Sequence, residues 1–137
     1  MYLLDTNVIS ELRKHKPHGG MAAWFTAVPN HELFLSAVTL GELQAGVELT
    51  RRQDKAKAAE IEDWIDEISD SYQVLSMDGR SFREWARLLD GQPERLSEDA
   101  MVAATARVHG LTIVTRNTRD FQSFGVRLLN PFTEKRT

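Results

Sequence analysis

The sequence predicts a single α/β domain, a three-layer α/β/α sandwich around a central, mainly parallel sheet of four to five strands. Short apolar runs alternate with longer segments of helical periodicity along the 137 residues, an order typical of parallel strands joined by crossover helices. The sequence has no internal repeat and no linker rich in Gly, Ser or Pro. Residues 1–137 are therefore expected to form one domain.

Apolar runs and the residues that bound them place the elements in order. Strands are expected at 2–4, 33–35, 74–77, 111–115 and 126–129. Helices are expected at 7–12, 21–28, 37–50, 53–70 and 82–89, then at 97–109, with a short helix within 116–124. Ser36 is a suitable N-cap for the third helix, and Ser97 for the sixth. Gly110 is expected to end that sixth helix.

The apolar faces of two predicted helices carry large aromatic side chains. Ile61, Trp64, Ile65 and Ile68 recur at the spacing of one helical face, and Phe82 and Trp85 begin a similar stripe in the next helix. Core packing is the expected use of these side chains, and a contact with a partner is the alternative.

Composition excludes several classes of function. There is no cysteine, which rules out disulfides, cysteine-ligated zinc, thiol catalysis and the usual Fe–S clusters. No apolar run is long enough to span a membrane, and the N-terminus lacks the pattern of a signal peptide, so a soluble cytoplasmic protein is expected. The net charge of −3 argues against coating of nucleic acid through bulk positive charge. The nucleotide-binding and serine-hydrolase motifs G-x-x-x-x-G-K-[ST], G-x-G-x-x-G and G-x-S-x-G are absent.

Two polar residues follow predicted strands. Asp5 ends the first strand, and Asn117 follows the fourth by two residues. Ligands bind at the carboxyl ends of parallel strands, where the strand order reverses. If the first and fourth strands are neighbours there, both side chains face one crevice. The alternative for Asp5 is an N-cap of the following helix.

Glu42 and Asp99 are acids that border apolar stretches. Glu42 is the only charged residue from Ser36 to Val47, and a carboxylate buried there must be paired, protonated or bound to a metal. The alternative is a partly exposed side chain that reaches water. Asp99 lies in the first turn of its helix, where the helix dipole alone favours an acid. For that reason neither Asp99 nor its neighbour Glu98 is distinctive when taken alone.

Together, Asp5, Glu42 and Asp99 suggest a site made of oxygen ligands. Carboxylates without histidine or cysteine suit Mg²⁺ or Mn²⁺ better than zinc or copper. Such an ion lowers the pKa of a bound water and stabilises charge that develops on a phosphate. Phosphoester hydrolysis is the chemistry that this site fits.

The sequence resembles the PIN-domain ribonucleases, of the kind that act as VapC- or FitB-type toxins in bacterial type II toxin–antitoxin systems. The segments that carry the resemblance are LLDTNVIS at 3–10, LSAVTLGEL at 35–43, EDAMVAATA at 98–106, IVTRNTRDF at 113–121 and LNPF at 129–132. They occur in order over essentially the whole chain. The resemblance implies an endoribonuclease that uses Mg²⁺ or Mn²⁺, in which a metal-activated water attacks the RNA phosphodiester.

The resemblance also assigns residues. It matches the conserved acids of the family to Asp5, Glu42 and Asp99, as catalytic and metal-binding residues. A fourth catalytic position, often an acid, is matched by Asn117, which brings no charge and would hold a second ion less tightly. Asp120 is the nearby acid that could compensate, or else an ordinary surface residue. The expected supporting residues are Thr6, Asn7 and Thr115.

The family resemblance further implies a homodimer, a cognate antitoxin whose tail covers the acidic cleft, and larger toxin–antitoxin complexes. Several basic residues are candidates for binding the phosphate backbone of RNA. They are Arg13, Lys14, Lys16, Arg51, Arg52 and Arg116. The alternative for each is a solvated surface charge.

Two other functions remain open from the sequence. One is a binding or regulatory module on a PIN scaffold with weakened catalysis, as the loss of an acid at Asn117 suggests. The other is a phosphatase like the haloacid dehalogenases, which also begin with a strand followed by Asp-Thr. That family needs a second Asp at the position of Asn7, so the phosphatase is the weaker alternative.

Overall fold

Five parallel strands form the central sheet of the computed structural model, which describes residues 1–133. The strands are β1 (Tyr2–Leu4), β2 (Leu33–Ser36), β3 (Gln73–Leu75), β4 (Thr112–Val114) and β5 (Leu128–Leu129). Their order across the sheet is β3-β2-β1-β4-β5, so the strand order reverses between β1 and β4. The last four residues of the predicted domain, 134–137, lie outside the described residues.

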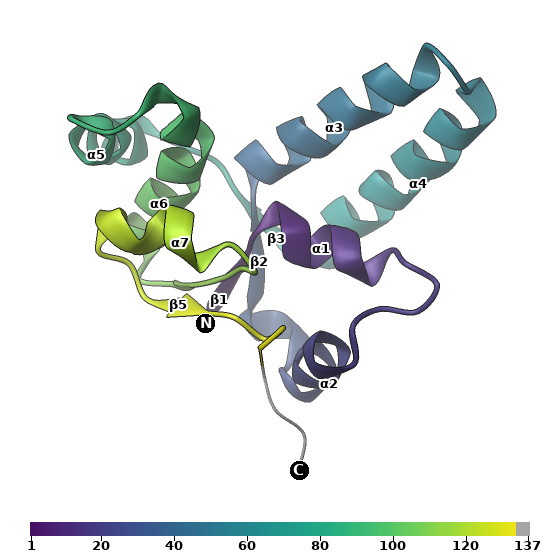
Figure 1. The fold of residues 1–137 in the computed structure, drawn as a ribbon, viewed down its shortest axis with the longest axis horizontal. Coiled ribbons are helices and arrows are strands. Elements are labelled where there is room, and N and C mark those ends of the chain that lie inside the picture. Colours follow the sequence, from purple (N-terminus) through teal and green to yellow (C-terminus); the bar gives the residue numbers. More distant parts are fainter. Residues whose placement is uncertain (134–137) are drawn as a thin grey trace.

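Helices cover both faces of this sheet, as expected for a three-layer α/β/α sandwich (Figure 1). They are α1 (Thr6–Leu12), α2 (Gly19–Ala27), α3 (Ala37–Arg51), α4 (Lys55–Ser71), α5 (Gly79–Leu89), α6 (Ser97–His109) and α7 (Thr118–Phe121). The helices α3 and α4 form a hairpin that extends away from the sheet. Within residues 1–133, no helix is long and apolar enough to cross a membrane.

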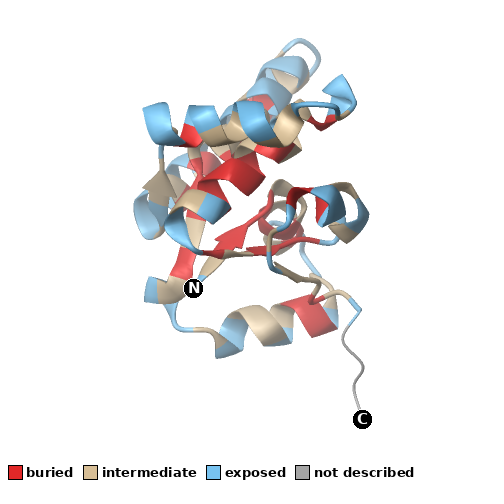
Figure 2. Ribbon diagram, turned by 90° about the vertical axis from the view of Figure 1, so that its left-hand side faces the viewer, coloured by how far each residue is buried: buried red, intermediate tan, exposed pale blue. Residues whose placement is uncertain are grey.

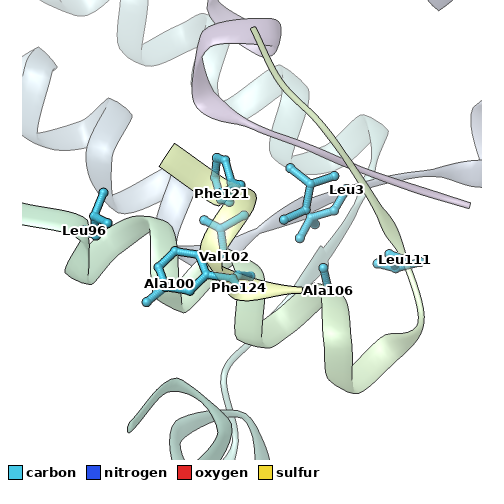
Figure 3. Close-up of a cluster of buried hydrophobic side chains, with 10 residues drawn as sticks. Leu3, Leu96, Ala100, Val102, Ala106, Leu111, Phe121 and Phe124 are labelled. Carbon is cyan, nitrogen blue, oxygen red and sulfur yellow. The ribbon is translucent and has the colours of Figure 1, made fainter. Parts of the chain in front are cut away.

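Successive side chains of β1 point into two different hydrophobic cores, one on each face of the sheet. Leu3 is fully buried against α6 and α7, in a cluster that contains Phe121 and Phe124 (Figure 3). The next residue, Leu4, is fully buried on the opposite face with Ile9 and Leu35. Successive strand residues point to opposite faces, so a strand covered by helices on both sides must be apolar at every position. Burial is accordingly concentrated in the sheet and the helix faces against it (Figure 2).

The aromatic stripes mostly pack inside the protein. Trp64 packs beside Val47 and Ile65 in the cluster that joins α3 to α4. Trp85 packs against the α6 core, and its indole N–H donates to the backbone oxygen of Ser97 at 3.0 Å. These contacts confirm core packing for the two tryptophans. Phe82 differs, since 46% of its surface is exposed.

The prediction that Ser97 caps the sixth helix is wrong. Ser97 is already helical, with φ −56° and ψ −46°, and is the first residue of α6. A 3-10 turn at Glu94–Leu96 leads directly into the helix, so the N-cap position falls on Leu96 and has no side-chain hydrogen bond. Ser36 does cap α3 as expected, since its hydroxyl accepts from the Val38 amide at 3.1 Å. Gly110 ends α6 with φ 68°.

Candidate active site

The site lies at the carboxyl edge of the sheet, where the strand order reverses. β1 and β4 are hydrogen-bonded neighbours, as the prediction of a shared crevice required. The Asp5 amide continues this pairing by donating to the Val114 oxygen at 2.9 Å. Asp5 and Thr115 thus follow paired strand ends, and two loops far apart in sequence meet at one place.

Asp5 is both an N-cap and the buried centre of this edge. Its Oδ1 accepts from the Thr6 amide at 2.9 Å, which caps α1. Its Oδ2 accepts from the Thr115 hydroxyl at 2.8 Å and from the side-chain Nδ2 of Asn7 at 3.2 Å. Burial raises the pKa of Asp5 above its ordinary value, against the opposing effect of these hydrogen bonds. The capping alternative is therefore correct, and it coexists with a position suited to ligand binding.

Glu42 extends from α3 toward the same edge. Its Oε1 accepts from the Thr6 hydroxyl at 2.7 Å, so Thr6 joins the α1 start to the second acid. Burial is the main reason that the pKa of Glu42 rises to about 7, and the charges of Glu98 and Asp5 raise it further. Glu42 is half-buried, so the alternative of a partly exposed side chain that reaches water stays open beside its assignment to the site.

Asp99 and Glu98 bring further negative charge from the first turn of α6. The pKa of Asp99 rises to about 6, first because of burial and then because of the charges of Asp5, Asp120 and Glu98. Arg95 opposes the rise. Sequence reasoning passed over Glu98 as an ordinary first-turn acid. Its position beside Asp99, at the start of a helix that reaches the sheet edge, was the available signal.

Asn117 connects the loop after β4 to Asp120. Its backbone amide donates to the Thr115 hydroxyl at 2.9 Å, and its side-chain Nδ2 donates to Asp120 Oδ2 at 2.7 Å. Asp120 also lies 3.5 Å from an Arg95 nitrogen. The neutral Asn117 side chain thus holds Asp120 in place, and the charge of Asp120 raises the pKa of Asp99.

The carboxylate oxygens at this edge are the type of donor that a hard divalent cation prefers. Within residues 1–133, no three His, Cys, Asp or Glu side chains are placed to hold one ion together. Mg²⁺ is usually bound through one or two carboxylates while it keeps several waters, so a closed protein cage is not required. Clustered acids with raised pKa values are electrostatically strained without a counter-charge, and a cation would relieve that strain.

A groove leads away from Glu42 between α1, α3 and α4. It has a volume of about 580 Å³ and is lined by Glu42, three basic residues (Arg13, Lys14 and Lys57) and the apolar Trp64. The Arg13 guanidinium lies 5.8 Å from the centre of the Trp64 ring. Two of the basic residues proposed to guide RNA therefore share a groove with a candidate metal ligand.

The other basic candidates lie in different surroundings. Arg51 pairs with glutamates of α3 and α4 at 3.1 and 3.0 Å. Arg116 places its guanidinium 3.8 Å from the centre of the Phe132 ring. Lys16 and Arg52 are exposed. A role in RNA binding stays a prediction for all of these residues.

Comparison with known proteins agrees with this geometry. The PIN domain family matches residues 2–126. This chain belongs to the PIN-domain family. Relatives of this PIN domain include the plasmid stability protein StbB of Pseudomonas syringae pv. tomato, 34% identical over 139 residues that cover 96% of this chain and 99% of StbB. Toxin FitB of Neisseria gonorrhoeae is 32% identical over 138 residues, which cover 96% of this chain and 99% of FitB.

A third relative of this PIN domain is the VapC ribonuclease Y4jK of Sinorhizobium fredii. It is 33% identical over 144 residues, which cover 96% of this chain and 98% of the relative. Among solved structures, the crystal structure of FitAcB from Neisseria gonorrhoeae matches with a TM-score of 0.86 and 29% identity, over 98% of this chain and 100% of that chain. The similarity therefore extends over nearly the full length of both partners.

Replacing Thr115 by Val is expected to lower RNA cleavage by about ten- to a hundredfold, because Asp5 is a candidate metal ligand and groups that orient metal ligands have effects of this size. The Thr115 hydroxyl is fully buried, donates to Asp5 and accepts from Asn7 and from the Asn117 amide. Its loss leaves buried polar groups unpaired, at a cost of about 1–3 kcal/mol in the free energy of unfolding. Cleavage rates and thermal melting measure both effects.

The matched control is Thr115→Ser, which keeps the hydroxyl. Cleavage by this variant should stay near the wild-type rate. A loss as large as that of Thr115→Val would mean that the hydroxyl alone does not account for the effect, and that the site also depends on how this buried side chain packs.

Proposed function

We propose that this PIN domain is a divalent-metal-dependent endoribonuclease and the toxin of a toxin–antitoxin pair. The observation that carries the proposal is that Asp5, Glu42 and Asp99 influence one another near the switch point of the sheet: burial raises the pKa of all three, and the charge of Asp5 raises the pKa of both Glu42 and Asp99 further. Relatives named a VapC ribonuclease and toxin FitB support the same activity and role.

In this proposal Asp5, Glu42 and Asp99 hold the cation directly or through water. Bound Mg²⁺ or Mn²⁺ would supply Lewis acidity, lowering the pKa of a water and neutralising charge on the phosphate. Thr6 and Thr115 fix the orientation of the carboxylates by hydrogen bonds. In this proposal a water would be the nucleophile, so the reaction would be hydrolysis of the phosphodiester.

RNA enters this proposal through the groove beside Glu42. Arg13, Lys14 and Lys57 would contact phosphates there, because guanidinium and ammonium groups neutralise the charge of a nucleic-acid backbone. The Lys14 ammonium group lies 2.9 Å from a carboxylate oxygen of Glu11, and the Lys14 side chain is exposed. The negative edge would then receive only the scissile phosphate, together with the cation.

The partners proposed for this chain are a second copy of itself and a cognate antitoxin. Solved relatives include FitAB bound to a DNA fragment, similar to this chain with a TM-score of 0.85 and 28% identity. An antitoxin that places a basic side chain against Glu42 and Asp99 would neutralise the same acids as the metal. Such a contact would exclude the cation and RNA together.

The proposal is tested by incubating purified protein with single-stranded RNA in Mg²⁺, in Mn²⁺ and in EDTA. We expect cleavage within the RNA chain in either metal and none in EDTA, with recovery when the metal is restored. Cleavage that persists in EDTA would overturn the assignment of a metal-dependent nuclease.

A weakened binding module is the second candidate, because Asn117 brings no charge. The hydrogen bond from Asn117 to Asp120 argues against this candidate, because the bond keeps an acid beside the site. Asn7 does not favour the phosphatase alternative either. It is a neutral amide that donates to Asp5 and Thr115, where that family needs an acid.

Asn117→Asp is expected to tighten Mn²⁺ binding severalfold and to lower the melting temperature of the metal-free protein. The new carboxylate would face Asp120 where an amide now donates at 2.7 Å, and like charges so close repel. A bound cation would reverse that repulsion. Calorimetric titration with Mn²⁺ and melting curves with and without metal measure the two effects.

Asp120→Asn is the partner variant, since it removes the acid and leaves Asn117 in place. It is expected to bind Mn²⁺ more weakly than wild type. If Asn117→Asp binds Mn²⁺ no more tightly than wild type, position 117 does not contribute to the metal site.

A further inference from the structure

A second hollow lies at the opposite end of the sheet from the acids. It has a volume of about 410 Å³ and opens between α5, α6 and the segments before β4 and β5. Four of the residues that line it are arginines (Arg80, Arg87, Arg107 and Arg127), and the one acid in the lining is Glu84. In a chain with a net charge of −3, this hollow, called the arginine hollow below, concentrates positive charge.

Helix periodicity and one carboxylate bring the arginines together. Arg80, Glu84 and Arg87 recur at the spacing that places residues on one face of α5. Arg107 reaches this face from α6, where its Nε donates to Glu84 at 2.6 Å. Arg87 lies 3.1 Å from the other oxygen of Glu84. Glu84 therefore holds two guanidinium groups at a fixed spacing.

Backbone oxygens fix the remaining side of the arginine hollow. Arg107 also donates to the Gly125 oxygen at 2.9 Å, and Arg127 donates to the Gly110 oxygen at 2.9 Å. Gly125 has φ 62°, and a Cβ there would lie 3.1 Å from the Arg107 guanidinium. Glycine therefore suits position 125 for two reasons. It adopts the positive φ without strain, and it leaves room for the Arg107 guanidinium. Guanidinium groups already held in place lose less freedom when a ligand binds.

We infer that the arginine hollow binds phosphoryl groups. A guanidinium presents a planar fork of N–H donors that matches two oxygens of a phosphate. A network built only to join α5 to α6 would need little beyond the contacts of Glu84 with Arg87 and Arg107. Arg80 and Arg127 add charge that no other acid in the lining balances. The volume falls within the range of small-ligand pockets.

The test uses the whole metal-free protein in EDTA at low salt, with pyrophosphate and a short single-stranded RNA as separate probes. Binding in the groove beside Glu42 is distinguished from binding in the arginine hollow, because Gly110 and Gly125 line only the arginine hollow. We expect pyrophosphate to shift the backbone amide resonances of Gly110 and Gly125 in NMR spectra. Displacement of pyrophosphate by RNA would identify a nucleic-acid backbone as the ligand. Pyrophosphate binding without displacement would identify a small phosphate compound.

Two variants and a control separate this site from general charge attraction. Replacing Arg80 and Arg87 together by Gln should weaken pyrophosphate binding about tenfold, since both side chains are exposed at the rim. Glu84→Gln should lower the melting temperature, because it removes the carboxylate that joins Arg87 to Arg107. Arg83→Gln is the control, because Arg83 is exposed on the same helix but does not line the arginine hollow.

Two results would overturn the inference: no shift of the two amides with either probe, or a loss in Arg83→Gln equal to that of the double variant. Because the measurement needs neither metal nor cleavage, its failure would not affect the proposed nuclease. Loss of nuclease activity would equally leave this test intact.

Discussion

Asp5→Asn is expected to lower RNA cleavage by at least about a thousandfold, since it removes a charge that would bind the catalytic cation directly or through water. The amide keeps an oxygen that can accept from the Thr6 amide, so the cap of α1 is retained. Burial already raises the pKa of Asp5, and a neutral side chain is therefore tolerated at this position. The fold should survive while the activity does not.

Asp78→Asn is the matched control for this prediction. Asp78 caps α5 as Asp5 caps α1, because its Oδ1 accepts from the Ser81 amide at 2.9 Å. Its cleavage rate should stay near that of wild type. Far-UV circular dichroism and melting curves establish that both variants are folded. Equal cleavage by Asp5→Asn and wild type would sink the assignment of Asp5, and would also point to a contaminating nuclease.

The sheet was predictable from sequence because its strands are buried on both faces. Leu3 and Leu4 pack into different cores, and only an uninterrupted apolar run satisfies both. Strand ends were less predictable. The fifth strand is confined to Leu128–Leu129, because pairing with β4 decides its length and hydrophobicity does not.

The main acids of the site were predictable for a similar reason. Glu42 is a lone charge among apolar residues, and Asp5 ends a buried strand, so each stands out locally. Glu98 and the hydrogen bond from Asn117 to Asp120 do not stand out in the sequence, because their roles depend on which loops meet in space. The arginine hollow could not be predicted for the same reason, since its arginine side chains come from α5, α6 and the segment before β5.

Glu42→Gln is expected to change how the stability of the metal-free protein depends on pH. Burial and neighbouring acids raise the pKa of Glu42 from 4.5 to about 7 in the folded state. Between these values the folded protein holds a proton that the unfolded chain has lost, so stability falls as pH rises through this window. The part-exposed side chain is screened by water, which limits its share to about 1–2 kcal/mol between pH 5 and pH 8.

Glu42→Gln should therefore be more stable than wild type at pH 8 and nearly equal to it at pH 5. Asp99, with a pKa of about 6, keeps part of the pH dependence in both proteins. Divalent metal should stabilise wild type more at pH 8 than at pH 5, because a carboxylate must lose its proton to bind the ion. The variant should lose at least about tenfold in Mn²⁺ affinity and lose most of its cleavage activity. Melting curves at several pH values and calorimetric titration measure these effects.

Glu62→Gln supplies a control with the opposite sign. Hydrogen bonds from Gln44 and Arg51 lower the pKa of Glu62, so its charge stabilises the fold above pH 4.5 and that contribution is lost in acid. Removing it should weaken the protein at pH 8 and leave Mn²⁺ binding unchanged. If Glu42→Gln behaves like Glu62→Gln, Glu42 is an ordinary surface carboxylate with no role in metal binding. If instead only Glu42→Gln gains stability at pH 8 and loses Mn²⁺, the strain that burial places on this carboxylate is what the cation relieves.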